Sequence, residues 1–87
     1  MKTKKRKHSE QNPISTEYPS FSKRLRYVMI LRDCSCHELA DRLFLAYSTV
    51  SGYLCDRRFP DCNMVRRIAI ELDVSADFLL GLSDQIN

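Results

Sequence analysis

The chain lacks any apolar run long enough to cross a membrane, because no stretch of its 87 residues approaches the roughly 18 consecutive apolar residues that a span needs. Its N-terminus is charged and then polar, so it also lacks the apolar stretch of a secretory signal. Two glycines are present, and they form no glycine-rich loop that could hold a phosphate group. We therefore expect a cytoplasmic protein with no membrane partner.

A pattern that indicates catalysis is also missing. The sequence contains no convincing Ser–His–Asp arrangement, and its length makes one domain at most. A hydrophobic fraction of 44% supports a small core, but a domain of this size lacks room for a deep substrate cleft. We expect that the protein is not an enzyme and that it uses no cofactor and no small-molecule substrate.

The four cysteines match no common zinc-binding pattern, even with His37 added to the set. Their spacing is C-x-C, then 18 intervening residues, then C-x6-C. A disulfide framework is not expected in a chain without an export signal. We interpret them as reduced, small apolar groups and expect no metal; a zinc site and a disulfide or redox role are the alternatives. The four are Cys34, Cys36, Cys55 and Cys62.

The net charge of +3 is confined to one end of the chain. Residues 1–20 hold five basic and two acidic side chains, whereas residues 21–87 hold nine of each. Residues 1–20 also lack the regular apolar positions that would offset the entropy of ordering, so we expect a disordered basic tail. It is either a cationic arm that lies along phosphates without sequence specificity or a solubilising terminus. Its basic run includes Lys4, Lys5, Arg6 and Lys7.

From residue 21 onward, apolar residues recur at helical spacing and predict five short helices. Four of the predicted helices follow a residue that can cap them, and Ser35 with Glu38 three positions later makes a capping box. With no strand signal and no internal repeat, we expect an all-α domain over residues 21–84, followed by residues 85–87 as the C-terminal end. The expected helices span 21–32, 36–43, 47–55, 62–72 and 76–80, with caps Ser20, Ser35, Asp61 and Ser75 and with Gly81 as the final stop.

The most informative segment covers residues 35–51, which read as two short helices joined by a tight turn at residues 44–46. The second helix begins with small and hydroxyl side chains instead of a charged, solvated face. A chain that presents a helix to the major groove of DNA has this form. A polar helix start that simply faces solvent is the alternative, because serine and threonine are common there.

Several short motifs follow one another in a characteristic order. In that order they resemble the XRE, or phage-repressor (Cro/CI-like), helix-turn-helix family, over about residues 21–84. The resemblance implies a compact five-helix, lambda-repressor-like DNA-binding domain. The motifs are Ser35-x-x-Glu38-Leu39-Ala40-x-x-Leu43, then Ser48-Thr49-Val50-Ser51-x-Tyr53, then Leu72-x-Val74-Ser75-x-Asp77-Phe78-Leu79-Leu80-Gly81.

The resemblance also implies roles for particular residues. The helix over 47–55 would be the recognition helix, and the helix before it would cross the DNA backbone. By position, the residues at base edges would be Tyr47, Ser48 and Gly52. The residues at the DNA backbone would be Cys36, Thr49, Ser51, Arg57 and Arg58.

Four positions depart from the family pattern. Cys36 stands in place of a phosphate-bracing glutamine, although a thiol hydrogen-bonds weakly. Phe44 replaces the turn glycine and resists a positive φ, so the turn must differ or store strain. Ala46 replaces the cap of the recognition helix, at a cost of roughly 1 kcal/mol. Asp56 puts a negative charge where a phosphate would approach.

Two further departures form a pair. Many family members have an arginine and a glutamate at the positions of Met29 and Leu54, where they form a partly buried ion pair. Replacing a buried ion pair by packed apolar groups is often neutral or stabilising, whereas losing one partner costs roughly 3–5 kcal/mol. We therefore predict that Met29 and Leu54 are in contact within the core.

These observations favour a transcriptional regulator that binds duplex DNA sequence-specifically, with the helix at about 47–55 in the major groove and with a homodimer on two half-sites. The alternative is an interaction module that kept the fold and binds DNA only non-specifically through the tail. His37 is expected to be solvated. Arg66 and Arg67 would form a solvated face or contact a second copy, and a modest dimer patch would comprise Ile70, Leu82 and Ile86.

Overall fold

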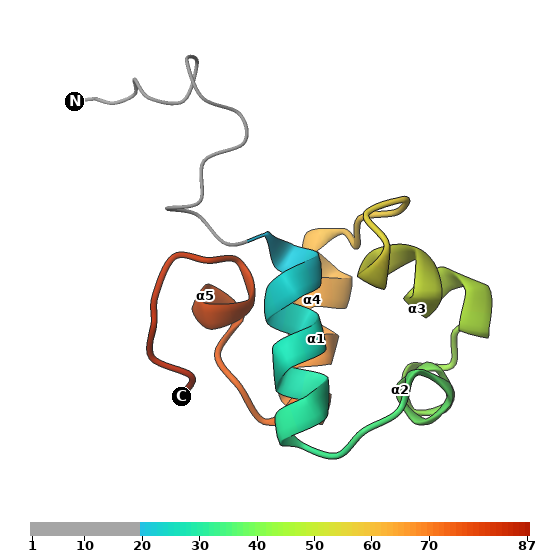
Figure 1. Cartoon of the computed structure of the whole chain (residues 1–87), viewed down its shortest axis with the longest axis horizontal. Coiled ribbons are helices and arrows are strands. Elements are labelled where there is room, and N and C mark those ends of the chain that lie inside the picture. Colours follow the sequence, from blue (N-terminus) through green and yellow to red (C-terminus); the bar gives the residue numbers. More distant parts are fainter. Residues whose placement is uncertain (1–19) are drawn as a thin grey trace.

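A computed structural model describes residues 20–87, and within them it contains five α-helices and no strand (Figure 1). The predicted all-α class is therefore confirmed for this part of the chain, and each predicted helix end lies within one residue of the observed one. The basic tail, with Lys4, Lys5, Arg6 and Lys7, lies outside the described residues. No helix within residues 20–87 has the length and apolar character that crossing a membrane requires. The helices are α1 (Phe21–Leu31), α2 (Cys36–Leu43), α3 (Tyr47–Leu54), α4 (Cys62–Leu72) and α5 (Ala76–Leu79).

The predicted N-terminal caps are confirmed. Ser20, Ser35, Asp61 and Ser75 each accept a hydrogen bond from a backbone N–H of the first turn that follows. At α2 the capping box is complete, because the Glu38 carboxylate also accepts from the Ser35 N–H at 2.8 Å. These bonds satisfy amide groups that have no partner inside a helix, so four of the five helix starts are fixed by their own sequence.

All five helices end in the same way. After each one, a residue with positive φ is followed by a residue whose N–H donates to the carbonyl five positions earlier, as in a Schellman motif. Glycine is the usual residue for this backbone conformation, yet it occupies one of the five positions. The chain thus makes its turns mostly without glycine. The positive-φ residues are Asp33, Phe44, Asp56, Asp73 and Gly81.

In the turn between α2 and α3, Phe44 adopts the left-handed backbone conformation that is usual for glycine, and the turn is therefore strained. Phe44 has φ 58° and ψ 42°, and the Leu45 N–H donates to the Ala40 carbonyl at 2.9 Å. The left-handed conformation costs a residue with a Cβ roughly 1–2 kcal/mol. The Phe44 ring is 90% exposed, so burial of the ring does not offset that cost.

The core is formed by one inward face from each helix. Helices α1 and α4 lie in the middle of the molecule, with α2 and α3 on one side and α5 with the C-terminal segment on the other (Figure 1). Helix α3 packs on α2 and α1, and its outer side is therefore left at one end of the domain. The largest fully buried side chains are Leu25, Leu39, Leu43, Ile68, Leu72, Leu79, Val28 and Val50.

Three arginines join helices by donating to carbonyls at the C-terminal end of another helix. Such carbonyls have no partner within their own helix and carry its negative dipole end, so a guanidinium satisfies both needs. Arg67 is exposed, as expected for a solvated face, and its guanidinium also bonds the end of α2. The pairs are Arg26 with the Leu54 carbonyl, Arg32 with the Leu72 carbonyl and Arg67 with the Leu43 carbonyl, each at 2.8 Å.

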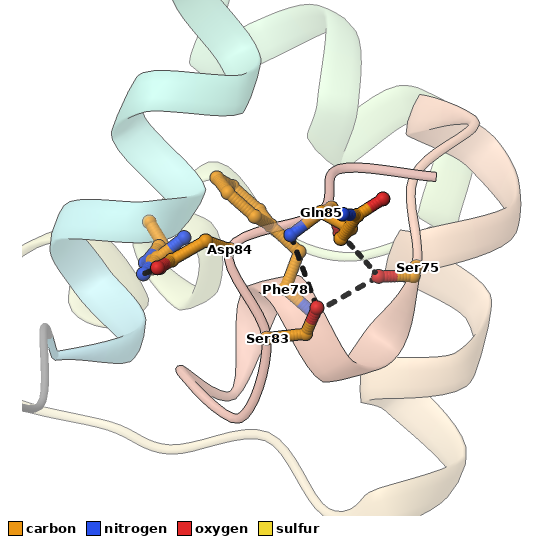
Figure 2. Close-up of polar contacts among 6 residues, drawn as sticks. Ser75, Phe78, Ser83, Asp84 and Gln85 are labelled. Atoms are coloured by element: carbon orange, nitrogen blue, oxygen red, sulfur yellow. Dashed lines mark hydrogen bonds and ion pairs between the residues drawn. The ribbon is translucent and has the colours of Figure 1, made fainter.

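The C-terminal segment folds back on α1 and α5 (Figure 2). The Ser75 hydroxyl donates to the Gln85 carbonyl at 3.2 Å, and the Ser75 N–H donates to the Ile86 carbonyl at 2.7 Å. Asp84 pairs with Arg24 at 2.9 Å. Ile86 packs against the core.

Candidate nucleic-acid interface

Helix α3 turns one side to the core and the other away from it. Val50 and Tyr53 are buried. Ser48 and Gly52, four positions apart, share the opposite side, because residues at this spacing lie above one another on a helix. Ser48 is exposed, and no side chain caps the helix, since its N-cap is Ala46. The predicted absence of a cap is confirmed.

The predicted residues beside Ser48 divide into exposed and half-buried ones. Tyr47 is 49% exposed at the first position of the helix. Thr49 and Ser51 are half-buried. A hydroxyl on the surface of a helix can contact a phosphate. The start of α3 offers the Tyr47 ring and the aliphatic hydroxyls of Ser48, Thr49 and Ser51 within two turns.

Tyr47 stacks on His37, which belongs to α2. The ring centroids are 4.2 Å apart and the planes differ by 24°. The Tyr47 ring therefore packs on the preceding helix, although it remains half exposed. His37 is exposed, as expected, but it also supports the ring at the start of α3. The two residues are ten positions apart, and no local pattern indicates that they meet.

Gly52 lies under the side chain of Arg58. A Cβ placed on Gly52 would be 2.8 Å from the Arg58 Cδ and 2.9 Å from its Cγ. Gly52 is consequently buried, although its side of α3 faces away from the core. Arg58 is the exposed residue at this point of the surface. It therefore covers Gly52, the residue that the resemblance places at a base edge.

The segment after α3 carries two arginines and one aspartate. Arg57 and Arg58 are exposed, and their guanidinium groups make no hydrogen bond or ion pair within residues 20–87. Asp56 is exposed and has φ 61°. Burial and the charge of Asp61 raise the pKa of the Tyr53 hydroxyl, while the Arg58 guanidinium acts in the opposite direction. Both charges therefore lie near this end of α3.

Cys36 does not lie on the outer surface with these residues. It is half-buried against the core and lines a cavity of about 450 Å³ between α1, α2 and the end of α3. Burial raises the pKa of its thiol, and the neighbouring Cys55 and Cys34 thiols add to the effect. The thiol is thus neutral at neutral pH and turned inward, which is a poor arrangement for bracing a phosphate.

Met29 and Leu54 both line that cavity. Met29 is buried and Leu54 packs against the core; their direct contact stays a prediction. Near them, Arg26 donates to the Leu54 carbonyl. A charged group from α1 therefore still bonds the end of α3, but to the backbone instead of to a side chain.

The cysteines lie at different depths. Cys34 is buried, Cys36 is half-buried, and Cys55 and Cys62 are exposed; all four are free thiols. In the described part of the chain, no three His, Cys, Asp or Glu side chains come together as metal ligands would.

No protein-family model matches the chain, and no curated protein matches it.

Proposed function

We propose that this protein is a transcriptional regulator that binds duplex DNA sequence-specifically by inserting α3 into the major groove. The observation that carries the proposal is the position of α3 at one end of the domain, with Tyr47 and Ser48 exposed on its first turn. An α-helix with its side chains is about 10–12 Å across, and the major groove is about 12 Å wide. The uncapped start of α3 adds unpaired amides and a positive dipole end that suit an anionic duplex.

The distribution of the arginines supports the same proposal. Four of them are engaged in the fold: three bond helix ends, and Arg24 pairs with Asp84. Four others have guanidinium groups without a partner within residues 20–87, and two of these, Arg57 and Arg58, lie in the segment after α3. A domain with no net charge over residues 21–87 thereby keeps two exposed cations beside α3. Contacts to phosphates would position the helix, whereas contacts from its outer side would read the bases.

The second candidate is a protein-interaction module with only non-specific DNA binding. Its support is the pair of aromatic side chains that flank α3, Phe44 at 90% and Phe59 at 71% exposure. Exposed aromatic groups suit a protein partner better than a phosphate backbone. Asp56, which is also exposed, would repel a phosphate.

The salt dependence of binding separates the two candidates. The full chain is compared with a variant in which Lys4, Lys5, Arg6 and Lys7 are replaced by glutamine, on a mixed-sequence duplex at several salt concentrations. Each lost phosphate contact lowers the slope of log affinity against log salt by roughly 0.9. We expect the variant to bind with a smaller slope. Complete loss of binding would favour the interaction module.

A second measurement addresses the insertion of α3. Ser48→Glu places a negative charge on the outer side of the helix, and we expect at least a tenfold loss of duplex affinity, roughly 1.4 kcal/mol. The matched control is Asn87→Glu, which adds the same charge at the opposite end of the domain, at an exposed position. Equal affinities for the two variants would contradict groove insertion.

The proposal includes a homodimer on two half-sites about 34–36 Å apart, one helical turn of DNA. The expected dimer residues Ile70 and Leu82 are 66% and 73% exposed, whereas Ile86 packs against the core. Sedimentation of the protein with a duplex that carries one or two half-sites would give the stoichiometry.

A further inference from the structure

The outer side of α3 has a gap where one side chain is missing. Ser48 and Gly52 share that side, and Gly52 contributes no atom beyond its backbone. Within a helix, glycine costs roughly 0.5–1 kcal/mol relative to alanine. A side chain from a neighbouring segment that packs against Gly52 would explain why this position has no Cβ.

The stem of Arg58 fills this gap. The site of an added Cβ on Gly52 lies 2.8, 2.9 and 3.3 Å from the Cδ, Cγ and Cβ of Arg58. Three successive atoms of the stem therefore run across Gly52, closer than they could pass over any residue with a side chain. The arginine comes from the loop, yet it covers the helix.

The backbone holds the loop in this position. The Gly52 carbonyl accepts from the Arg57 N–H at 2.9 Å and from the Arg58 N–H at 3.2 Å. Asp56, with its positive φ, turns the chain back toward α3. The same glycine thus anchors the loop through its carbonyl and receives the arginine stem on its Cα.

We infer that Arg58 is a specificity-determining residue, which takes the place of a missing α3 side chain and reads a guanine in the major groove. The inference rests on the proposed function. Arg58 is exposed, its guanidinium has no partner within residues 20–87, and its stem lies on the side of α3 that also carries Ser48. A guanidinium presents two parallel N–H donors, and guanine presents the O6 and N7 acceptors that match them.

Selection from a pool of randomised duplexes tests the inference. We expect the full-length protein to select a guanine at one position, and Arg58→Ala to lose that preference by about 5- to 150-fold while other selected positions stay unchanged. Arg58→Lys should keep the salt dependence of binding and still weaken the guanine preference, because an ammonium lacks the planar fork.

Arg57→Ala is the matched control. It removes an equal charge from the neighbouring position, and we expect it to weaken binding evenly on all sequences without changing the selected bases. An unchanged guanine preference in Arg58→Ala would overturn the inference. So would stronger binding by Arg58→Ala, which would mean that the arginine covers α3 and hinders the duplex.

The outcomes distinguish this inference from the proposed function. If the protein selects a sequence and Arg58→Ala selects the same one, the inference is wrong and the proposed function stands. If the full chain selects no sequence at all, both are wrong.

A structural measurement on the free protein supplies an independent test. Nuclear Overhauser contacts are expected between the Gly52 Hα atoms and the Arg58 Hγ and Hδ atoms. In Gly52→Ala these contacts must weaken, because a real Cβ would displace the stem, and the guanine preference should fall with them. Absence of the contacts in the unmodified protein would overturn the inference without any DNA.

Discussion

Replacing Phe44 by glycine should stabilise the domain, because Phe44 carries a backbone cost that its side chain does not offset. The left-handed conformation costs a residue with a Cβ roughly 1–2 kcal/mol. Glycine removes this cost, but its greater flexibility in the unfolded chain lowers the free energy of unfolding by roughly 0.4–1 kcal/mol. With the ring 90% exposed, little apolar contact is lost. The midpoints of the two ranges leave a net gain of about 0.8 kcal/mol in the free energy of unfolding.

For a domain of this size, about 1 kcal/mol moves the melting temperature by roughly 4–8 °C. We therefore expect Phe44→Gly to melt roughly 2–8 °C above the unmodified protein, measured by circular dichroism at 222 nm. Phe44→Ala is the matched control. It removes the same ring and retains the Cβ, so the strain persists and the melting temperature should stay within about 2 °C, as for most surface substitutions.

The comparison of the two variants decides the outcome. A rise in Phe44→Gly without a rise in Phe44→Ala supports stored strain at this turn. If both variants melt at the temperature of the unmodified protein, the reasoning is refuted, because the backbone cost would then be absent. If both melt lower, the ring contributes packing that its exposure does not indicate.

Three further predictions concern contacts between helices and the start of α2. Arg67→Ala should lower the free energy of unfolding by roughly 1–3 kcal/mol, because it leaves the carbonyl at the end of α2 without its charged donor. Arg66→Ala, which removes an exposed neighbour, should be nearly neutral. Urea denaturation measures both variants. Met29→Arg should destabilise the domain by roughly 3–5 kcal/mol, because Met29 is buried. Adding Leu54→Glu should restore part of this loss. A double variant no more stable than the single one would show that the two side chains do not meet. Hydrogen bonds from the Ser35 N–H and hydroxyl hold the pKa of Glu38 below its ordinary value, so its stabilising effect is present above that ordinary value and is lost as the pH falls through the lower, folded value. The stability difference between the unmodified protein and Glu38→Gln should therefore shrink as the pH falls below the ordinary pKa of a glutamate. A difference that does not depend on pH would contradict this account.

Local chemistry made the helices predictable. The starts at Ser20, Ser35, Asp61 and Ser75 depend on a cap and the three residues after it, and that information is contiguous in the sequence. The ends were also predictable to within one residue, even where glycine is absent. At Phe44 the sequence identified the conflict but not its outcome, since that depends on whether the rest of the turn holds the residue in place.

The contacts that shape the candidate site were not predictable in the same way. Arg26 and Arg67 bond carbonyls 28 and 24 positions away, and every backbone carbonyl looks alike in a sequence. Arg58 covers Gly52 only because the turn at Asp56 reverses the chain. A signal was present in retrospect: a glycine inside a short helix, followed by an arginine six positions later, leaves room for one side chain to take the place of another.

Chemical-shift mapping of the full-length, ¹⁵N-labelled protein with a selected duplex tests the central claim most directly. The account predicts that the largest changes occur at the amides of Tyr47, Ser48 and Thr49 on the first turn of α3, with the Arg58 side-chain N–H as a further site of change. Changes confined to residues 1–20, with the amides of α3 unmoved, would contradict it.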